Sequence, residues 1–232
     1  MPFCTICGST GFAPGPKGRL NKVLVSMYPP RWAYASFPYP RCNQCGSLER
    51  HRIARNVFDC IKIDDVFRTY RALQFSNDPV LCPQWFKSFE LSLYGAQNSM
   101  DVQDIPRRSG TYDVVVCCHV IEHVPDHRTA IRSLIRVASN RGFLYLAYPN
   151  PRYLAITRDW GYSDSGRHGH YREIGRDFEK EYKVIIPNTF VFAVAGTDAV
   201  TGGSDLHYLI TKSQFWRGRI KRMLGGSARS IQ

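Results

Sequence analysis

The stretch that most constrains the fold lies at residues 113–126, which read DVVVCCHVIEHVPD. Its first six residues form a short apolar run rich in β-branched side chains, and such a run is typical of a strand buried on both faces of a parallel sheet. Polar residues follow, among them His119 and Glu122, and Pro125-Asp126 then provides a start for a helix. Open α/β sheets bind ligands where a buried strand delivers polar groups into the loop before a helix. The stretch therefore predicts an α/β fold with a ligand-binding site at the end of this strand.

The size and composition of the chain fit one α/β domain with a small appendage. With 232 residues, of which 44% are hydrophobic, the chain can bury a sizeable core and is not a disordered protein. No apolar run approaches the ~18 to 20 residues that a membrane-spanning helix needs. The N-terminal residues MPFCTICG contain no charged start followed by an apolar core, so no secretory signal is visible. We therefore expect a cytoplasmic protein.

The charge of the chain is strongly basic. It has 31 basic and 19 acidic side chains, which give a formal net charge of +12. Such an excess could indicate a polyanionic partner, either nucleic acid or an anionic membrane, or it could be solvated surface charge. Outside the C-terminal region the basic residues are scattered and form no stripe interleaved with aromatic residues. A small-molecule substrate is therefore favoured over nucleic acid.

The cysteines predict a structural zinc module at residues 1–46. Cys4 and Cys7 form one pair and Cys42 and Cys45 another, each with two residues between its members. Two such knuckles supply four thiolates, which structural zinc binds in tetrahedral geometry. The segment between them is rich in proline and glycine and cannot hold a long helix, so we expect a zinc ribbon. A disulfide framework or chance spacing is the alternative, and a closed site of four thiolates leaves zinc no catalytic role.

The other four cysteines are expected to pack as small apolar side chains. Cys118, at the end of the apolar run, is the one that would face a pocket; the others are Cys60, Cys82 and Cys117.

The second cysteine pair leads directly into a predicted helix. Ser47 is a suitable N-cap, Glu49 complements the helix N-terminus, and apolar residues recur at helical spacing over residues 48–61. The sequence CNQCGSLERHR at 42–52, this helix and the stretch 113–126 together resemble a bacterial group of class I S-adenosylmethionine-dependent methyltransferases that carry an N-terminal Cys4 zinc ribbon. The resemblance implies a Rossmann-like seven-stranded sheet over residues 47–213, with helices on both faces and the last strand antiparallel.

The resemblance also implies where the cofactor binds. The strand at residues 71–75 is followed by Ser76-Asn77-Asp78-Pro79, without the usual Gly-x-Gly pattern, and a second strand is expected at residues 90–94. Tyr94 matches the position of the carboxylate that usually holds the ribose, and Asp104 matches the residue that accepts from the adenine amino group. The cofactor-binding residues implied are Phe75, Ser76, Asn77, Tyr94, Asp104, Cys118 and His119.

Histidines are the candidate catalytic residues. A neutral His119 could take a proton from a hydroxyl or amine, since an imidazole has an unperturbed pKa near 6.5. His123 follows in the same loop, while His168 and His170 lie in a long loop at residues 149–175 and match a His-x-His element of the resembling group. The alternative is that all four are hydrogen-bonding or capping residues. A metal site of His119, His123 and His127 would need a helix that continues through Pro125, which proline disfavours.

The remaining elements complete the expected domain. An amphipathic helix is predicted at 126–138, a strand at 142–148, a helix starting at Asp177, and an antiparallel hairpin from 190–195 and 206–211. Residues 214–224 form a basic amphipathic segment that could lie on an anionic membrane. Because Arg219 interrupts its apolar face and Gly218 weakens a helix, a frayed basic tail over 214–232 is favoured, with 225–232 disordered.

Three functions are consistent with the sequence. The first is methyl transfer from S-adenosylmethionine to an oxygen or nitrogen of a small metabolite or sugar-like substrate. The second is a protein of the same fold whose altered cofactor positions support other chemistry or a role as a binding or partner subunit. The third is an RNA methyltransferase, which is supported by charge alone.

Overall fold

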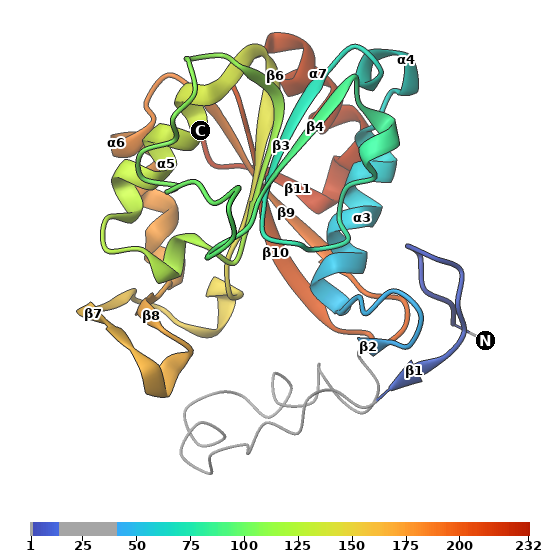
Figure 1. Ribbon diagram of the computed structural model, residues 1–232, viewed down its shortest axis with the longest axis horizontal. Coiled ribbons are helices and arrows are strands. Elements are labelled where there is room, and N and C mark those ends of the chain that lie inside the picture. The colour runs from blue at the N-terminus through green and yellow to red at the C-terminus, as the bar shows by residue number, and fades with distance from the viewer. Residues whose placement is uncertain (1, 14–40) are drawn as a thin grey trace. The chain divides into compact units, whose positions relative to one another are not determined.

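The computed structural model describes residues 2–13 and 41–232 of the chain. These residues, drawn in colour in Figure 1, fall into two compact units by their contacts. The first contains the described residues up to Cys60 together with 78–81 and 195–205; the second contains 61–77, 82–194 and 206–232. The segment predicted to link the two cysteine pairs as an irregular ribbon lies mostly outside the described residues.

The first unit combines a small two-stranded sheet with one long helix. Strands β1 (Phe12–Ala13) and β2 (Arg41–Cys42) pair antiparallel, and α3 spans Glu49–Ile61, close to the predicted range. The buried Arg52 of α3 donates to both carboxylate oxygens of Asp198, at 2.7 and 2.8 Å, and to the carbonyl of Ser47. This bidentate geometry compensates two charges that would be costly to bury alone.

The predicted Rossmann-like seven-stranded α/β sheet is confirmed. Its strand order is β11-β9-β10-β6-β5-β3-β4. Pairing is parallel between β3 and β4, between β3 and β5, and between β5 and β6, whereas β10 runs antiparallel to β6 and β11 runs antiparallel to β9. The strands are β3 (Arg71–Phe75), β4 (Ser88–Ser92), β5 (Tyr112–Cys118), β6 (Ala138–Ala147), β9 (Phe190–Thr197), β10 (Ser204–Thr211) and β11 (Ala228–Ser230).

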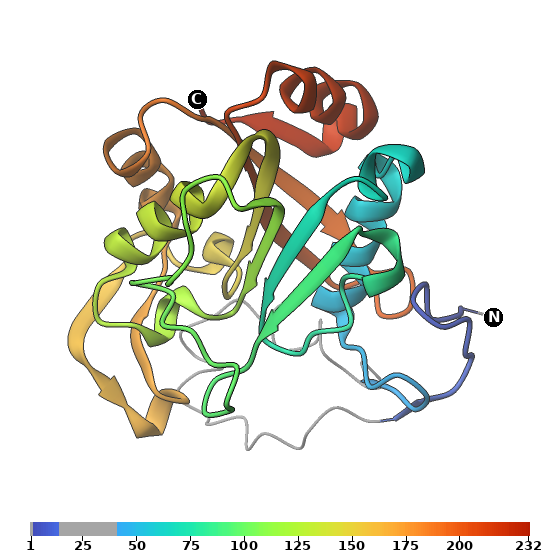
Figure 2. The ribbon, with the colours of Figure 1, turned by 45° about the horizontal axis from the view of Figure 1, so that its top comes forward.

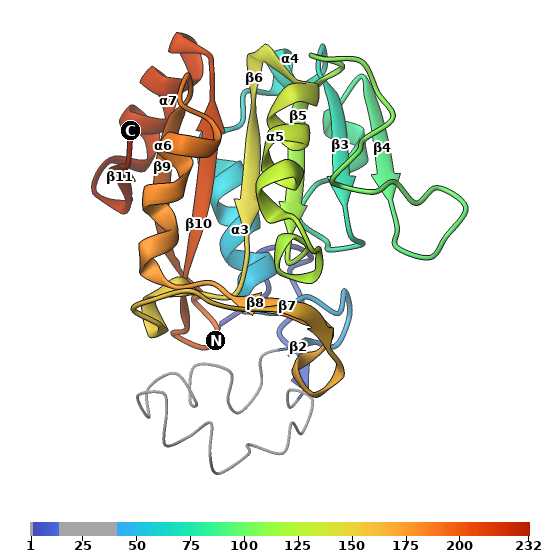
Figure 3. The ribbon, with the colours of Figure 1, turned by 90° about the vertical axis from the view of Figure 1, so that its left-hand side faces the viewer.

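Both faces of this sheet are covered by helices, because alternate residues of its strands point to opposite sides. On one side Phe143 contacts Phe67 of α4 and Trp216 of α7, with ring centroids 6.4 and 4.8 Å apart. On the other side Tyr148 contacts Phe178 at 5.5 Å. Figures 1 and 3 show α5 and α6 together on that second side. The helices are α4 (Asp64–Phe67), α5 (His127–Val137), α6 (Tyr182–Ile185) and α7 (Gln214–Leu224).

Six short 3-10 segments connect these elements. They are η1 (Pro83–Trp85), η2 (Ile121–His123), η3 (Pro151–Tyr153), η4 (Ser165–Arg167), η5 (Arg176–Glu181) and η6 (Gly225–Ser227). The predicted helix at Asp177 is thus formed by η5 running into α6.

Strand β5 is central, and every one of its residues is buried. At its start, the pairing with β6 shifts register between Tyr112 and Val114. The carboxylate of Asp113 stabilises this register shift. It accepts hydrogen bonds from the Arg71 amide, the Ser139 hydroxyl and the Arg141 guanidinium. Only glycine fits at 142, since an added Cβ would lie 1.7 Å from the Asp113 carbonyl oxygen.

The C-terminal segment differs from the predicted frayed tail. Residues 214–224 form α7, whose Trp216, Ile220 and Leu224 are buried, and residues 228–230 form the edge strand β11 (Figure 2). Arg219, which was expected to break the apolar face, instead donates to the carbonyls of Ile61 and Lys62. The segment is therefore part of the folded domain.

Two further boundaries differ from the sequence prediction. Strand β4 runs over 88–92 rather than 90–94, and the predicted loop at 149–175 contains an antiparallel hairpin of β7 (Arg158–Asp164) and β8 (His170–Glu173). Within the described residues, no helix has the length and apolarity needed to cross a bilayer.

The packing of α7 predicts a large difference between two adjacent aromatic residues. Trp216→Ala should lower the free energy of unfolding by about 3–5 kcal/mol because it leaves a cavity beside Phe143 and Phe67. Phe215→Ala is the matched control, since its ring is 54% exposed, and should change stability by about 0.5 kcal/mol. Urea denaturation followed by circular dichroism measures both; equally small changes would mean that the segment is peripheral.

Candidate functional site

The candidate site lies at the carboxyl edge of the parallel strands. In the sheet, Phe75 at the end of β3 stands opposite both Ser92 of β4 and Cys117 of β5, so the loops that follow leave the same edge. Ligands of open α/β sheets bind at this edge. Phe75 and Cys118, two of the predicted cofactor-binding residues, are buried there.

The first residue of each of two loops has an unusual backbone conformation. Ser76 after β3 has φ of 69° and His119 after β5 has φ of 54°. Few residues other than glycine adopt such angles, and those that do gather at functional sites. The Ser76 amide donates to the Ser92 carbonyl at 3.1 Å and the His119 amide to the Ala147 carbonyl at 2.8 Å, so neighbouring strands hold both turns in place.

Glu122 lies beneath His119 on the 3-10 turn η2. Its side chain is 1% exposed, and its Oε1 lies 3.5 Å from Nδ1 of His119. Burial is the largest single influence and raises the pKa of the Glu122 carboxyl, but His119, the Glu122 backbone amide and His123 together lower this pKa below its usual value. The site therefore contains an ionised carboxylate out of contact with water.

The hairpin of β7 and β8 brings His170 to His123 of η2. The rings of His123 and His170 meet edge to face with centroids 4.5 Å apart. Burial is the largest cause of the lowered pKa of His170. His168 lies at the exposed end of the hairpin with φ of 60°, and its ring centroid is 6.2 Å from that of His170. Three of the four candidate histidines are thus joined through Glu122 and η2, and His168 lies farther out.

Arg172 of β8 holds the hairpin against η2. Its side chain is buried and donates to the carbonyls of Ile121, Val124 and Pro125 at 2.6–3.1 Å, and to Asp159 at 2.7 Å. Sequence reasoning assigned no role to Arg172 and gave Glu122 only a supporting one. The only sequence signal for these two roles was that Arg172 lies in the segment HGHYR and Glu122 in the segment VIEHV.

The other predicted cofactor-binding residues are spread along the same edge. Ser76 and Asn77 follow β3 directly, whereas Asp104 is exposed and lines a cavity of about 610 Å³ together with basic residues such as Arg107 and Arg132. Tyr94 is fully exposed and lies two residues beyond the end of β4, because the strand ends at Ser92. The predicted alignment of Tyr94 with the strand end is therefore wrong.

Glu90, in the middle of β4, forms hydrogen bonds away from the candidate site. Glu90 accepts from Arg107 and from the hydroxyl of Tyr112. These contacts tie β4 to the start of β5 and keep this carboxylate in the body of the strand, away from the carboxyl edge.

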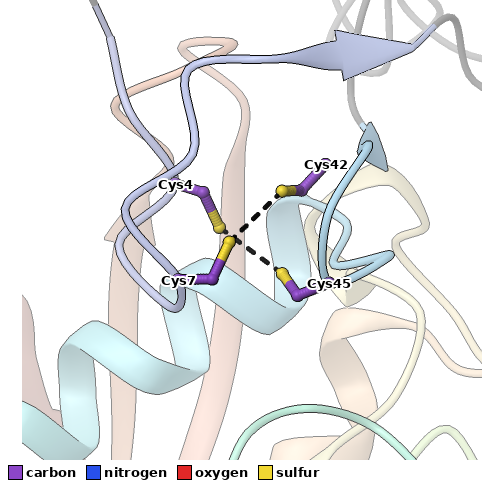
Figure 4. Close-up of side chains that lie close together, drawn as sticks. All are labelled: Cys4, Cys7, Cys42 and Cys45. Carbon is purple, nitrogen blue, oxygen red and sulfur yellow. Dashed lines mark hydrogen bonds between the residues drawn. The ribbon is translucent and has the colours of Figure 1, made fainter.

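The four cysteines of the first unit converge as the spacing predicts (Figure 4). The sulfurs of Cys4 and Cys45 are 3.7 Å apart, and those of Cys7 and Cys42 are 3.5 Å apart. Four sulfurs at Zn–S distances of about 2.3 Å lie roughly 3.8 Å from one another in a tetrahedron. Although burial opposes it, hydrogen bonds from the Cys45 and Gln44 amides lower the pKa of Cys42 to about 6. The cluster thus has the donor set and spacing of a tetrahedral metal site.

The role of Arg172 can be tested by comparing it with Arg167 of the same hairpin. Arg172→Ala should lower the free energy of unfolding by about 3 kcal/mol, because three buried carbonyls lose their charged donor. Arg167→Ala should cost at most about 1 kcal/mol, since its ion pairs with Asp164 and Glu173 are solvent-exposed.

Hydrogen exchange of residues 158–173, together with urea denaturation, measures both effects. Unchanged protection of the hairpin in Arg172→Ala would contradict its anchoring role.

No curated protein matches the chain. Among solved structures, the chain is similar to the CurJ carbon methyltransferase, with 14% identity, a TM-score of 0.42 and coverage of 62% of this chain and 49% of that one. It thus spans about half the length of that protein.

Two bacterial proteins are similar over more of their own length. A putative methyltransferase from Bacillus halodurans has 9% identity, a TM-score of 0.43 and coverage of 68% of this chain and 99% of that one. A possible histamine N-methyltransferase from Thermotoga maritima has 9% identity, a TM-score of 0.42 and coverage of 69% and 87%. The family model described as a methyltransferase domain matches residues 48–180, more than half of the 232 residues. The chain belongs to this methyltransferase domain family.

Proposed function

We propose that this protein is an S-adenosylmethionine-dependent methyltransferase that acts on an oxygen or nitrogen of a small metabolite or sugar-like substrate. Family membership supports the reaction class. The observation that carries the proposal is the pair of His119 and Glu122 at the carboxyl end of β5, with Nδ1 and Oε1 3.5 Å apart. Such a pair beside the ligand-binding edge of the sheet can remove a proton from an acceptor.

The donor groups along this edge suit the cofactor in most respects. Ser76 turns the chain through a left-handed conformation that glycine usually supplies, which lets the backbone approach a ligand closely. Ser76 and Asn77 would hold the amino-acid part and Asp104 the adenine amino group. S-adenosylmethionine would supply a methyl group that its sulfonium already activates.

In this proposal the protein contributes mainly position and proton transfer. His119 would accept the proton of the hydroxyl or amine, and the carboxylate of Glu122 would hold the imidazole and stabilise its charge. His168 and His170, on the hairpin, would border the acceptor. Fixing the acceptor in line with the activated methyl group can account for much of the rate enhancement.

We further propose that the four cysteines bind structural zinc. The hydroxyl of Ser47 lies 3.3 Å from the Cys4 sulfur and 3.2 Å from the Cys45 sulfur, which supports an outer hydrogen bond to the ligands. Clustered thiols of this kind are typical of reducing compartments, in accord with a cytoplasmic location.

A second candidate is a methyltransferase-fold protein with other chemistry or a partner role. The observation that favours it is the end of β4, where Ser92 stands in place of a carboxylate and Tyr94 points into solvent. RNA methylation stays a prediction supported by the net charge of +12. Contact of α7 with an anionic membrane also stays a prediction, supported by exposed Phe215 and Met223 beside basic residues.

Calorimetric titration with S-adenosylmethionine and S-adenosylhomocysteine tests the proposed cofactor. We expect saturable binding, weakened roughly 10- to 100-fold in Asp104→Asn because a charged hydrogen bond is lost. Asp101→Asn, three residues earlier on the same exposed turn, should bind as the unmodified protein does. Neither heat nor a thermal shift at millimolar ligand would contradict the methyltransferase proposal and favour the second candidate.

The zinc proposal is tested by metal analysis. The purified chain should hold one zinc ion through its four cysteines, and Cys7→Ser should lose it and unfold more readily. Cys60→Ser is the matched control, because Cys60 is an exposed cysteine outside the cluster. Zinc retention in Cys7→Ser equal to that of the control would exclude the cluster as the site.

A further inference from the structure

We propose that Glu122, His123 and His170 form a second metal site, which binds a divalent transition-metal ion at the carboxyl end of β5. Its existence depends only on these residues, whereas its role in the reaction rests on the proposed methyl transfer. The site is distinct from the four cysteines, which lie in the other compact unit.

The first observation is the convergence of three ligand atoms. One carboxylate oxygen of Glu122 and one ring nitrogen each of His123 and His170 all lie within 4.8 Å of one another. Ligands bound at about 2.0–2.2 Å around one ion are roughly 3–3.5 Å apart. Small side-chain rotations therefore suffice to bring the three groups onto a single ion.

The second, independent observation is the burial of the Glu122 carboxyl group without a hydrogen-bond partner. Its side chain is 1% exposed, and among the described residues neither of its oxygens has a hydrogen-bond donor. Nδ1 of His119 lies 3.5 Å from Oε1. A buried carboxyl group is costly unless its oxygens are paired or coordinate a metal. A cation between Glu122 and the two histidines would supply that partner.

The backbone around the site is held in place. Glu122 and His123 are adjacent on η2, whose carbonyl at Ile121 accepts from the buried Arg172 of β8. Arg172 lies two residues from His170, so one short strand both anchors the turn and supplies the third ligand. An added Cβ at Gly169 would lie at van der Waals distance, 3.9 Å, from Nδ1 of His123, so the turn of the hairpin lies against this imidazole.

The donor set indicates the kind of ion. Two imidazoles and one carboxylate suit zinc, iron or manganese in the divalent state rather than calcium, which prefers oxygen ligands throughout. Three protein ligands leave coordination positions open, as in catalytic rather than structural sites. Because His123 is exposed, the open side of the ion would face solvent or a substrate.

A metal ion at this site favours oxygen over nitrogen as the methyl-accepting atom of the substrate. A substrate hydroxyl bound to the ion becomes more acidic, since the cation stabilises the alkoxide. The O–H proton passes to His119, the new O–CH3 bond forms as the S–CH3 bond breaks, and the sulfonium leaves as a neutral thioether. The other oxygen of Glu122 stays beside His119 and orients it.

The proposed ligands differ from the metal site of His119, His123 and His127 that was considered from the sequence. His127 lies on α5 after the break at Pro125, and its Nε2 is 3.4 Å from Glu181. Its contacts with Glu181 and Phe178 turn it toward η5, away from the proposed ligand set, so it serves as a matched control histidine.

The test measures metal binding with two probe ions on the full chain, its cysteine cluster left loaded with zinc. Mn2+ binding is followed by electron paramagnetic resonance, because manganese avoids thiolates, and Zn2+ binding by calorimetry. We expect one additional site for at least one of the two ions. Affinity should fall at least tenfold in Glu122→Gln and in His170→Ala, and should be unchanged in His127→Ala.

Absence of additional binding of both ions, or binding that persists in Glu122→Gln and His170→Ala, would overturn the proposal. Circular dichroism of each variant excludes loss of the fold as the cause of a negative result. Because S-adenosylmethionine binding is measured separately, metal binding without cofactor binding would disprove the methyltransferase function while leaving the site intact.

Discussion

The burial of an ionised carboxylate at Glu122 is the constraint on which the site depends. A charge without water must be compensated by nearby groups, and the fold brings those groups from three directions. His119 comes from the strand end, His123 from the same turn, and His170 from the hairpin. Arg172, which fixes the turn to the hairpin, is itself buried and shares its charge among three carbonyls and Asp159. The polar network is therefore assembled by the packing of β8 on η2.

Local sequence information predicted the elements whose stability is local. Strand β3 was predicted with its observed limits, and α5 begins where Asp126 caps it by accepting from the Thr129 amide at 2.9 Å. β5 was recognised because seven consecutive buried residues leave a continuous apolar run. The knuckle spacing predicted the four cysteines that the structure brings together. For the strands and the helix, and within each cysteine pair, the necessary residues lie within a few positions of one another.

The errors arose where distant contacts decide the structure. The limits of β4 are set by its pairing with β3, in which Arg71 faces Ser88. The sequence of residues 90–94 alone does not indicate this pairing. In α7, Gly218 weakens the helix locally, yet Trp216 gains contacts with Phe67 and Phe143 from far along the chain. The sequence also suggested the candidate histidines but not their grouping. Only the hairpin places His170 rather than His127 next to His123.

Gly142 has a consequence that reaches across the sheet. The β5–β6 register is fixed at its beginning by the close approach of this glycine to the Asp113 carbonyl. A larger residue at 142 would have to change the register of the pair, and a shift carried along the strands would reach Cys118 and Ala147, roughly 16 Å away at the other end. The His119 amide donates to the Ala147 carbonyl, so a shift of Ala147 would also change the orientation of the His119 imidazole. A residue remote from the candidate site therefore helps to set the register of the strands that carry it.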